Sequence, residues 1–579
     1  MSKIMRVCTP SSNWRIPQSK KLLLMSAAVA TFLTIRHISL AQPKSQSPPP
    51  SRLQAETWHA SAGGGVAAVK TYSQAYVDYL QAISFATEGS EPEALHLLAD
   101  SMRLQPANNP ASAIAYELLV GRRAYTPIKL LGHTEPINRV LYSRDGTKIA
   151  TVSADRTARL WNPRTGSLLT PPLTHEEAVI SAAFNFDGSI LATGTKEGQV
   201  TLWNTATGTA IRPSVLVNSD ILCVAFSPDG KFFAAGTEDG RLLMWSVSSG
   251  DPVSVFPHYH ESVTEIDFNS KSTNLVAATG DDMADLLDIG GRRIARLKHE
   301  NTVSAALFNP DSSVVLTASR DGLAALWNAD TGAPLGITLK HNSAVLAATF
   351  SNDGSRIATG SFDHTARVWD TKTGRPITAA LQHPAIVTEV ALSADNRFIA
   401  TASVDQTVRI WDATTGDLVH LPIRSKDGFP YVAFSPDSSS IAVAAGLVVI
   451  LLDTPPRIPA PAWILTLTEF DASLFNKYDF RPFDRAPVRN LQHELEASKE
   501  NDPWTRLGRW YFAPSAIRSV TPQSSLSLET YVSSLIKRED RPSLEYARSL
   551  SQGHPQWMEK ITPLLAKTCT SGNKKSNPP

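Results

Sequence analysis

A tryptophan that lies just before a turn returns along this chain at a nearly fixed distance. The gaps are 42, 42, 82, 42 and 42 residues between Trp161, Trp203, Trp245, Trp327, Trp369 and Trp411. The long gap contains a weaker copy in which Leu287 replaces tryptophan, and Leu452 marks an eighth copy. A catalytic site is usually built once, whereas a stretch repeated at this period supplies a structural unit that stacks on its own copies. The period therefore predicts eight equivalent units.

Each unit contains short strands separated by turns. Residues 340–374 hold three β-prone runs, and a fourth strand is expected after the Thr-Gly or Ser-Gly turn that follows them. Asp-Gly pairs suit tight hairpins because glycine adopts a positive φ without a steric penalty. Such pairs occur at 145–146, 187–188, 229–230 and 353–354. Because one four-stranded sheet cannot bury both of its faces, the copies are expected to pack on each other around a ring.

The repeated residues resemble the Trp-Asp (WD) repeat family of β-propellers over residues 126–454. We therefore expect a mainly β fold with eight blades, seven being the alternative, closed by pairing of residues 126–133 with residues 447–453. The resemblance also implies that His, Ser or Thr, Asp and Trp form a hydrogen-bonded tetrad within a blade. The four complete sets are His133, Ser153, Asp155 and Trp161; His299, Ser319, Asp321 and Trp327; His341, Ser361, Asp363 and Trp369; and His383, Ser403, Asp405 and Trp411. The second unit has Glu197 in place of Asp, the third lacks the His, and the eighth lacks His, Asp and Trp.

A His, a Ser and an Asp could instead form a hydrolase triad. Four nearly identical copies argue against this, because every blade needs a buried polar network whereas an active site is needed once. The sequence has no phosphate-binding loop, kinase motif, zinc-binding helix or nucleophile elbow. Its three cysteines, Cys8, Cys223 and Cys569, have no disulfide or zinc spacing. We therefore expect no catalytic, cofactor-binding or metal-binding residues.

The beginning of the chain has the pattern of an export signal. The first 55 residues contain no acid, Lys20 and Lys21 precede an apolar run at 22–35, and small residues end at Ala41. Fourteen apolar residues are too few for a bilayer span of about 20. We therefore expect a signal peptide at 1–41, cleaved to leave Gln42 first, with a single-pass anchor at 22–35 or an organelle transit peptide as alternatives. A Pro/Ser/Gly-rich linker is expected at 42–65.

Helical patterns lie on both sides of the repeats. Residues 66–125 are similar to tetratricopeptide helices over about one and a half repeats, with a capping box at Ser90 and Glu93. Leu95, Leu98 and Met102 recur on one face of the second helix. Because fewer than three such repeats rarely stand alone, a cap packed beside the propeller is an alternative to a peptide-binding groove.

A second helical region is expected at 455–566, followed by a disordered tail at 567–579. Its clearest helix start is Asp502-Pro503, an N-cap acid followed by proline at the first helical position. The region is similar to segments that follow WD arrays in large bacterial proteins. Its Trp504, Arg506, Arg509 and Trp510 are more typical of helix packing than of a ligand site.

Charge narrows the class of partner. Removing residues 1–41 takes away six of 55 Lys and Arg and none of 54 acids, which leaves 49 basic against 54 acidic residues. Nucleic-acid binding needs a basic surface, so no nucleic-acid partner is expected. The leading hypothesis is a non-enzymatic scaffold that binds proteins in an exported or membrane-associated assembly, with no small-molecule substrate. The alternative is an exported enzyme or small-molecule binder that acts at the central channel.

The resemblance also suggests where partners bind. It implies that the residue before the tetrad Asp lies near a face where partners of WD propellers commonly dock. On three consecutive blades that position holds Arg320, Phe362 and Val404. Because Arg and aromatic side chains supply much of the energy at protein interfaces, these three are the candidate partner-binding residues. Scattered exposed apolar residues are also ordinary on surfaces, and this alternative stays open.

Overall fold

The computed structural model describes residues 74–105, 109–122, 127–425, 430–455, 460–475, 486–513, 518–551 and 554–571. The predicted signal peptide at 1–41 and the linker at 42–65 lie outside the described residues. The last helix continues to Ser571, so the segment predicted as a tail begins as helix. Among the helices within these ranges, none combines the length and the apolar character needed to cross a bilayer.

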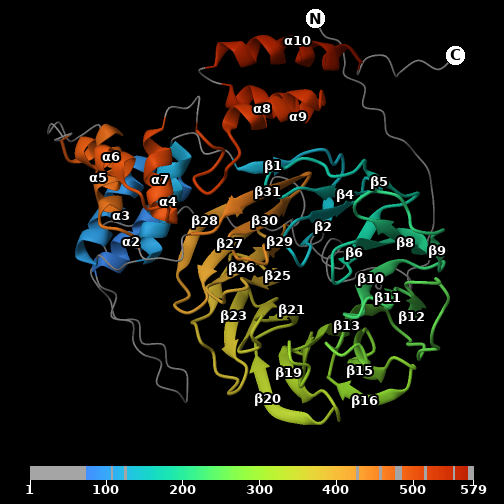
Figure 1. The fold of residues 1–579 in the computed structure, drawn as a ribbon. Helices are drawn as coiled ribbons and strands as arrows, with labels where there is room; N and C mark the ends of the chain where they lie inside the picture. Colours follow the sequence, from blue (N-terminus) through green and yellow to red (C-terminus); the bar gives the residue numbers. More distant parts are fainter. Residues whose placement is uncertain are drawn as a thin grey trace, which may run out of the picture. The chain divides into compact units, whose positions relative to one another are not determined.

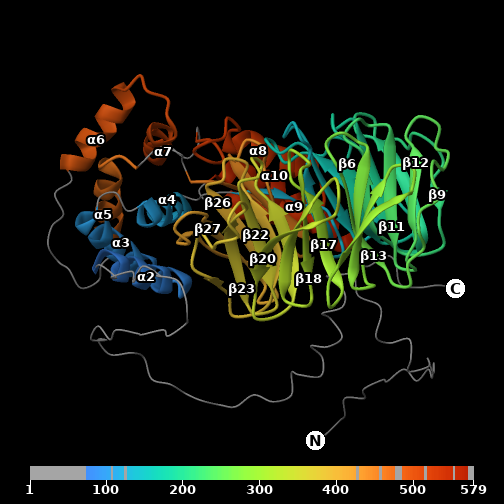
Figure 2. The same cartoon turned by 90° about the horizontal axis from the view of Figure 1, so that it is seen from below.

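Within the described residues, eight antiparallel sheets follow one another around a ring (Figures 1 and 2). The first four blades are β2 (Ile137–Tyr142), β3 (Ile149–Ser153), β4 (Thr157–Trp161) and β5 (Leu173–Thr174); β6 (Val179–Phe184), β7 (Ile190–Thr195), β8 (Gln199–Asn204) and β9 (Val215–Leu216), with the short helix η2 (Lys196–Gly198); β10 (Ile221–Phe226), β11 (Phe232–Thr237) and β12 (Leu242–Ser246); and β13 (Val263–Phe268), β14 (Asn274–Thr279), β15 (Met283–Asp288) and β16 (Arg293–Lys298). The other four are β17 (Val303–Phe308), β18 (Val314–Ser319), β19 (Leu323–Asn328) and β20 (Pro334–Lys340); β21 (Val345–Phe350), β22 (Arg356–Ser361), β23 (Thr365–Asp370) and β24 (Leu381–Gln382); β25 (Val387–Leu392), β26 (Phe398–Ser403), β27 (Thr407–Asp412) and β28 (Leu418–Arg424); and β29 (Tyr431–Phe434), β30 (Ser440–Ala445) and β31 (Val448–Asp453) with β1 (Ile128–Leu130). The expected eight-bladed propeller is confirmed.

The ring closes as the spacing predicts. Strand β1 pairs antiparallel with β31, with Ile128 opposite Leu451 and Leu130 opposite Val449. The eighth blade thus takes its outer strand from residues that precede the first blade. The third blade is less regular, because its outer segment joins β12 through isolated bridges such as Trp245 with Pro252.

The two weak copies keep the register of the complete ones. Leu287 lies opposite Leu275 and Leu452 opposite Ile441, as Trp161 lies opposite Ile149 in the first blade. Both leucines are buried. They therefore fill the tryptophan positions, as the sequence predicts, while supplying no side-chain hydrogen-bond donor.

Helices flank the ring in sequence on both sides. Before it come α2 (Gln74–Thr87), α3 (Glu91–Leu104) and α4 (Asn109–Arg122). After it come α5 (Trp463–Phe475), α6 (Ala486–Ala497), α7 (Pro503–Phe512), α8 (Leu528–Lys537), α9 (Arg541–Leu550) and α10 (Pro555–Ser571). Asp502 caps α7, as predicted, by accepting the N–H groups of Trp504 and Thr505. The capping box predicted at Ser90 and Glu93 is wrong. Ser90 has φ −92° and ψ 61°, outside the extended conformation of a typical N-cap, and its side chain makes no capping bond.

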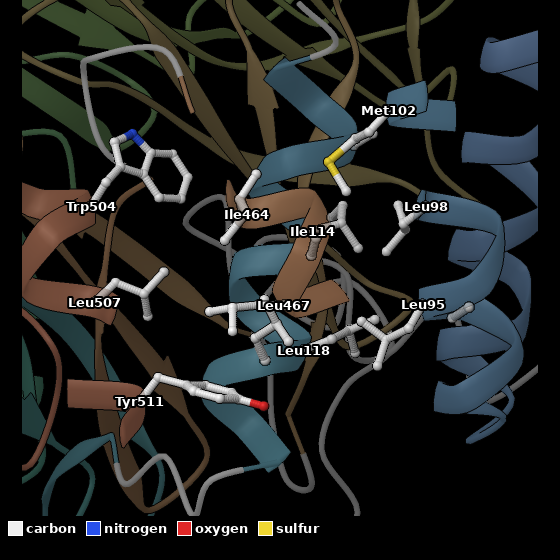
Figure 3. Close-up of a cluster of buried hydrophobic side chains, with 14 of the residues drawn as sticks. Leu95, Leu98, Met102, Ile114, Leu118, Ile464, Leu467, Trp504, Leu507 and Tyr511 are labelled. Atoms are coloured by element: carbon white, nitrogen blue, oxygen red, sulfur yellow. The ribbon is translucent and has the colours of Figure 1, made fainter. Parts of the chain in front are cut away.

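The helices from the two ends of the chain share one hydrophobic core (Figure 3). Leu95 and Leu98 of α3 and Ile114 of α4 are buried in the same cluster as Leu467 of α5 and Leu507 of α7. Helix α5 contacts both α3 and α4, and α6 contacts α5 and α7. Helices α2 to α4 are thus extended by helices that lie more than 300 residues later in the sequence. This extension buries apolar side chains that α2 to α4 do not cover by themselves.

Helices from both sides of the ring also cover the outer edges of two blades. On β28 of the seventh blade, the hydroxyl of Tyr79 donates to the carbonyl of Leu418, and Glu117 Oε2 accepts the N–H of Leu421 at 2.7 Å. On β1 of the eighth blade, the hydroxyl of Tyr531 accepts the N–H of Lys129 at 2.8 Å. An uncovered strand edge offers free backbone groups to other chains, so these contacts protect the place where the ring closes.

Leu467→Ala tests the shared core. The side chain is 0% exposed, so its loss should lower the free energy of unfolding by about 2–5 kcal/mol. Because α3 and α5 share this core, hydrogen exchange should accelerate in α3 as well as in α5. Leu286→Ala, which removes an equally buried leucine from the fourth blade, should leave exchange in α3 unchanged. If Leu467→Ala accelerates exchange in α5 alone, the two helical segments do not depend on each other.

Candidate functional site

In the first, fifth and sixth blades the tetrad is a continuous chain of hydrogen bonds that runs from the turn into the blade, whereas the His383–Asp405 link of the seventh blade is too long for a hydrogen bond. In the first blade, His133 Nδ1 lies 2.8 Å from Asp155 Oδ2 and His133 Nε2 lies 2.7 Å from Thr151 Oγ1. The indole N–H of Trp161 donates to the same threonine oxygen at 2.9 Å. The histidine therefore connects a carboxylate in the turn to a tryptophan in the core, with Thr151 between them.

The serines predicted in the tetrads lie outside this chain of bonds. Ser153 Oγ donates to the carbonyl of Glu135 at 2.8 Å and accepts the N–H of Asp155 at 3.1 Å, so it fixes the turn. Ser319, Ser361 and Ser403 occupy the same position in their blades. The prediction chose the wrong hydroxyl because residues two apart on a strand point to the same face. The bridging residues are Thr151, Thr193, Thr317, Thr359 and Thr401.

The other blades show how far the network can vary. The His-to-Asp distance is 2.8 Å for His299 and Asp321, 3.0 Å for His341 and Asp363, and 3.7 Å for His383 and Asp405. In the second blade Glu197 is exposed, and the buried Nδ1 of His175 has no hydrogen-bond partner within the described residues. Burial lowers the pKa of His175 to about 4. The chain of bonds in that blade therefore ends at a neutral histidine.

The fourth blade replaces the tetrad with a buried ion pair. Asp285 takes the position that Arg159 has in the first blade, opposite Ala277 where the first blade has Thr151. Its carboxylate is fully buried and lies 2.6 Å from Arg293 Nε and 3.4 Å from Arg296 Nε. Both arginines belong to β16, so the pair connects the third and fourth strands of the blade.

The tetrads do not have the geometry of a hydrolase triad. Both ring nitrogens of His133 are used, one by Asp155 and the other by Thr151. The hydroxyl of Ser153 bonds to backbone groups, so among the described atoms it has no histidine to activate it. Burial raises the pKa of Asp363, but hydrogen bonds from Thr365, Asn342 and His341 together outweigh it and lower the pKa to about 2. These networks therefore stabilise turns.

The tetrad turns lie beside the loops that enter each blade, on one face of the ring. In successive blades the N–H groups of Arg320, Phe362 and Val404 donate to carbonyls of the adjacent entry loop. We call this surface the loop face; it consists of 134–136, 154–156, 176–178, 196–198, 218–220, 238–240, 260–262, 280–282, 300–302, 320–322, 342–344, 362–364, 384–386 and 404–406. The side chain of Phe362 is 45% exposed, and Arg320 and Val404 are half-buried. Arg320 Nε is enclosed and has no hydrogen-bond partner among the described atoms.

Charged residues also converge on the axis of the ring, which the sequence analysis did not foresee. Arg139, Glu265 and Glu389 occupy one register position on the first strands of the first, fourth and seventh blades. Burial raises the pKa of both Glu265 and Glu389, and the Arg139 guanidinium opposes the rise in each. The three side chains are therefore within electrostatic range of one another. The sequence signal that could have revealed this cluster is that the three residues occupy equivalent positions in the repeat.

The carboxylates of the fourth blade have structural partners. Glu265 Oε2 accepts the N–H of Ala306 at 3.1 Å, and Asp267 Oδ2 accepts the N–H of Phe308 at 2.8 Å. Burial raises the pKa of Glu265 to about 7 and that of Asp267 to about 6. Both groups thus join the fourth blade to the first strand of the fifth. Across the described residues, no group of three or more His, Cys, Asp or Glu is arranged to hold a metal ion.

Comparison with known proteins agrees with this geometry. Residues 125–369 match the family described as the first β-propeller of IFT122, and residues 374–412 match the WD domain, G-beta repeat. The chain contains a WD-repeat β-propeller. The crystal structure of the computationally designed Ika8 protein is similar to the propeller, with 24% identity and a TM-score of 0.51 over 57% of this chain and 99% of that chain. This likeness concerns the fold alone. No curated protein matches the chain.

Asp363→Ala tests the role of the WD-repeat tetrads. The change leaves His341, Thr365 and the N–H of Asn342 without their acceptor, so unfolding should become easier by about 1–3 kcal/mol. Thermal unfolding measures this, and Asp251→Ala on an exposed turn should have little effect. An unchanged melting temperature for Asp363→Ala would contradict the stabilising role assigned to the tetrads.

Glu265→Gln tests the axial carboxylate. Because the folded-state pKa of about 7 lies above the ordinary value of 4.5, the folded protein loses stability as pH rises from 4.5 to 7. Glutamine can still accept the N–H of Ala306 but cannot ionise. The stability gained by the variant relative to the parent protein should therefore be greater at pH 8 than at pH 5, by about 1–2 kcal/mol. Glu197→Gln, at an exposed site, is the matched control. If the free energy of unfolding depends on pH in the same way in Glu265→Gln and in the parent protein, the raised pKa assigned to Glu265 is wrong.

Proposed function

We propose that this protein is a non-enzymatic scaffold that binds protein partners on the loop face of its WD-repeat propeller. The observation that carries the proposal is Phe362, an aromatic side chain 45% exposed on a turn whose backbone is fixed by Asp363 and Ser361. A rigid turn presents such a side chain at little entropic cost, and aromatic anchors supply much of the energy of protein interfaces. Arg320 and Val404 flank it on the neighbouring blades.

The alternative, a small-molecule site in the channel, has weaker support. One oxygen of Glu265 and one of Asp267 already accept backbone N–H groups, so these carboxylates serve the joint between two blades. A cavity of about 730 Å³ lies elsewhere, between α9 and α10, where Arg548, His554 and Met558 line it. Polar side chains such as Glu545 and Ser551 also line this cavity, but it lies at the helices and not in the channel, so it gives no support to a channel site.

We further propose that the scaffold works outside the cytoplasm or at a membrane. The support is the acid-free beginning of the chain, with Lys20 and Lys21 before the apolar run at 22–35. The amino-terminal sequence of protein purified from its native host tests this, since cleavage would make Gln42 the first residue.

A photo-crosslinking experiment tests the docking face. Benzoylphenylalanine at position 362 should capture a protein partner in native cells, because this side chain would lie within the interface. The matched control is position 186, where Phe186 is 50% exposed on a hairpin at the opposite end of the strands. A folded Phe362→Ala, Arg320→Ala protein should bind the captured partner at least about tenfold more weakly. Capture at 186 but not at 362, or full affinity in the double variant, would contradict the proposal.

A further inference from the structure

The loop face is divided into an acidic part and an apolar part. The acidic part, which we call the acidic arc, comprises the acids in the turns and entry loops of the second, third and fourth blades: Glu176, Glu177, Glu197, Asp220, Glu238, Asp239, Glu261, Asp281 and Asp282. Lys196 is the one Lys or Arg in these same loops. The sixth and seventh blades instead present the exposed Phe362 and the half-buried Val404, and their loop-face acids are the tetrad residues Asp363 and Asp405.

The protein leaves the acidic arc largely unneutralised. Within 4 Å, the described residues pair one of these acids, Asp239, with a cation, Arg241 at 2.7 Å. Asp220 accepts the N–H of Glu197 at 2.8 Å, which orients its carboxylate without cancelling its charge. Burial and the nearby carboxylates of Asp220 and Asp239 raise the pKa of Glu238, and the Lys196 ammonium opposes this only in part. Like charges are therefore held close together within the third blade.

We propose that the loop face recognises a lysine- or arginine-rich amphipathic segment of a partner protein. The basic side chains would lie over the acidic arc, and the apolar side chains would contact Phe362 and its neighbours on the sixth and seventh blades. This inference rests on the proposed scaffold function and adds the chemistry of the partner. A field of one sign across three blades attracts cations and repels nucleic acid and anionic membranes. Complementary charge chiefly sets partner choice and association rate, so binding should weaken steeply with salt.

The test uses the full chain and two fluorescent sixteen-residue peptides that share one leucine pattern, one with lysine and the other with glutamate at the remaining positions. Anisotropy should detect binding of the lysine peptide in 50 mM NaCl, weakened at least about tenfold in 300 mM NaCl, and no binding of the glutamate peptide. Binding of the glutamate peptide, or no binding of the lysine peptide, would overturn the inference. Binding of a 20-base-pair DNA duplex would overturn it as well.

Matched variants locate the binding. The first variant, with Glu176→Gln, Glu197→Gln and Asp282→Asn, removes three exposed charges from the acidic arc. Its affinity for the lysine peptide should be about tenfold lower than that of the parent protein in 50 mM NaCl. Asp187→Asn, Asp311→Asn and Asp330→Asn remove three exposed charges from turns at the other end of the strands and should change affinity less than about twofold. If both triple variants lose the same affinity for the lysine peptide, the peptide is attracted by net charge alone, and the inference is overturned. Circular dichroism and melting temperature should match the parent protein in both.

A third variant separates this inference from the proposed function. Phe362→Ala should weaken the binding of the lysine peptide and also the binding of the photo-captured partner, because both contact the apolar part of the loop face. If the captured partner needs Phe362 but binds the acidic-arc variant as tightly as the parent, the scaffold proposal survives and the inference fails. If neither the peptide nor the partner responds to Phe362→Ala, the docking face itself is wrong.

Discussion

Closure of the ring depends on the pairing of β1 with β31. Each blade must bury two sheet faces, which is possible around a ring only if the last blade meets the first. Here three residues from before the first blade, Ile128 to Leu130, complete the last one. The chain consequently enters and leaves the ring at the same blade. The segments that flank the propeller in sequence are thereby brought together in space.

This proximity explains the helical core. Helix α3 has an apolar face made by Leu95, Leu98 and Met102, and three helices alone offer too little partner surface to bury it. Because the ring closes, α5 and α7 emerge beside α3 and α4 and complete the cluster through Leu467 and Leu507. The same helical regions then cover β28 and β1, the edge strands next to the closure. Closure and helical packing therefore stabilise each other.

The repeat period allowed the blade number, the register and the closure to be predicted, because all three follow from a spacing that each copy must keep. It could not distinguish Thr151 from Ser153, since both hydroxyls point to one face of the strand and only side-chain geometry selects between them. A signal was nevertheless present: threonine fills this position in the five blades that have both the histidine and the tryptophan, and Ala235, Ala277 and Val443 fill it elsewhere. The shared helical core could not be predicted, because helical periodicity identifies an apolar face but not the segment that covers it.

The division between strands and loops also limits what the fold explains. Buried groups such as His341 and Thr359 are committed to internal hydrogen bonds, and changing them costs stability. Exposed turn residues usually affect stability by less than about 0.5 kcal/mol, so folding does not dictate them. On this loop face, however, acids are concentrated on three consecutive blades, and in the third blade burial and the carboxylates of Asp220 and Asp239 raise the pKa of Glu238. Some of these acids hold their own turns, as Asp281 does by accepting the N–H of His260. The concentration of the others is explained by contact with a partner that neutralises them, and for this reason the loops, more than the repeated strands, carry the functional information in this propeller.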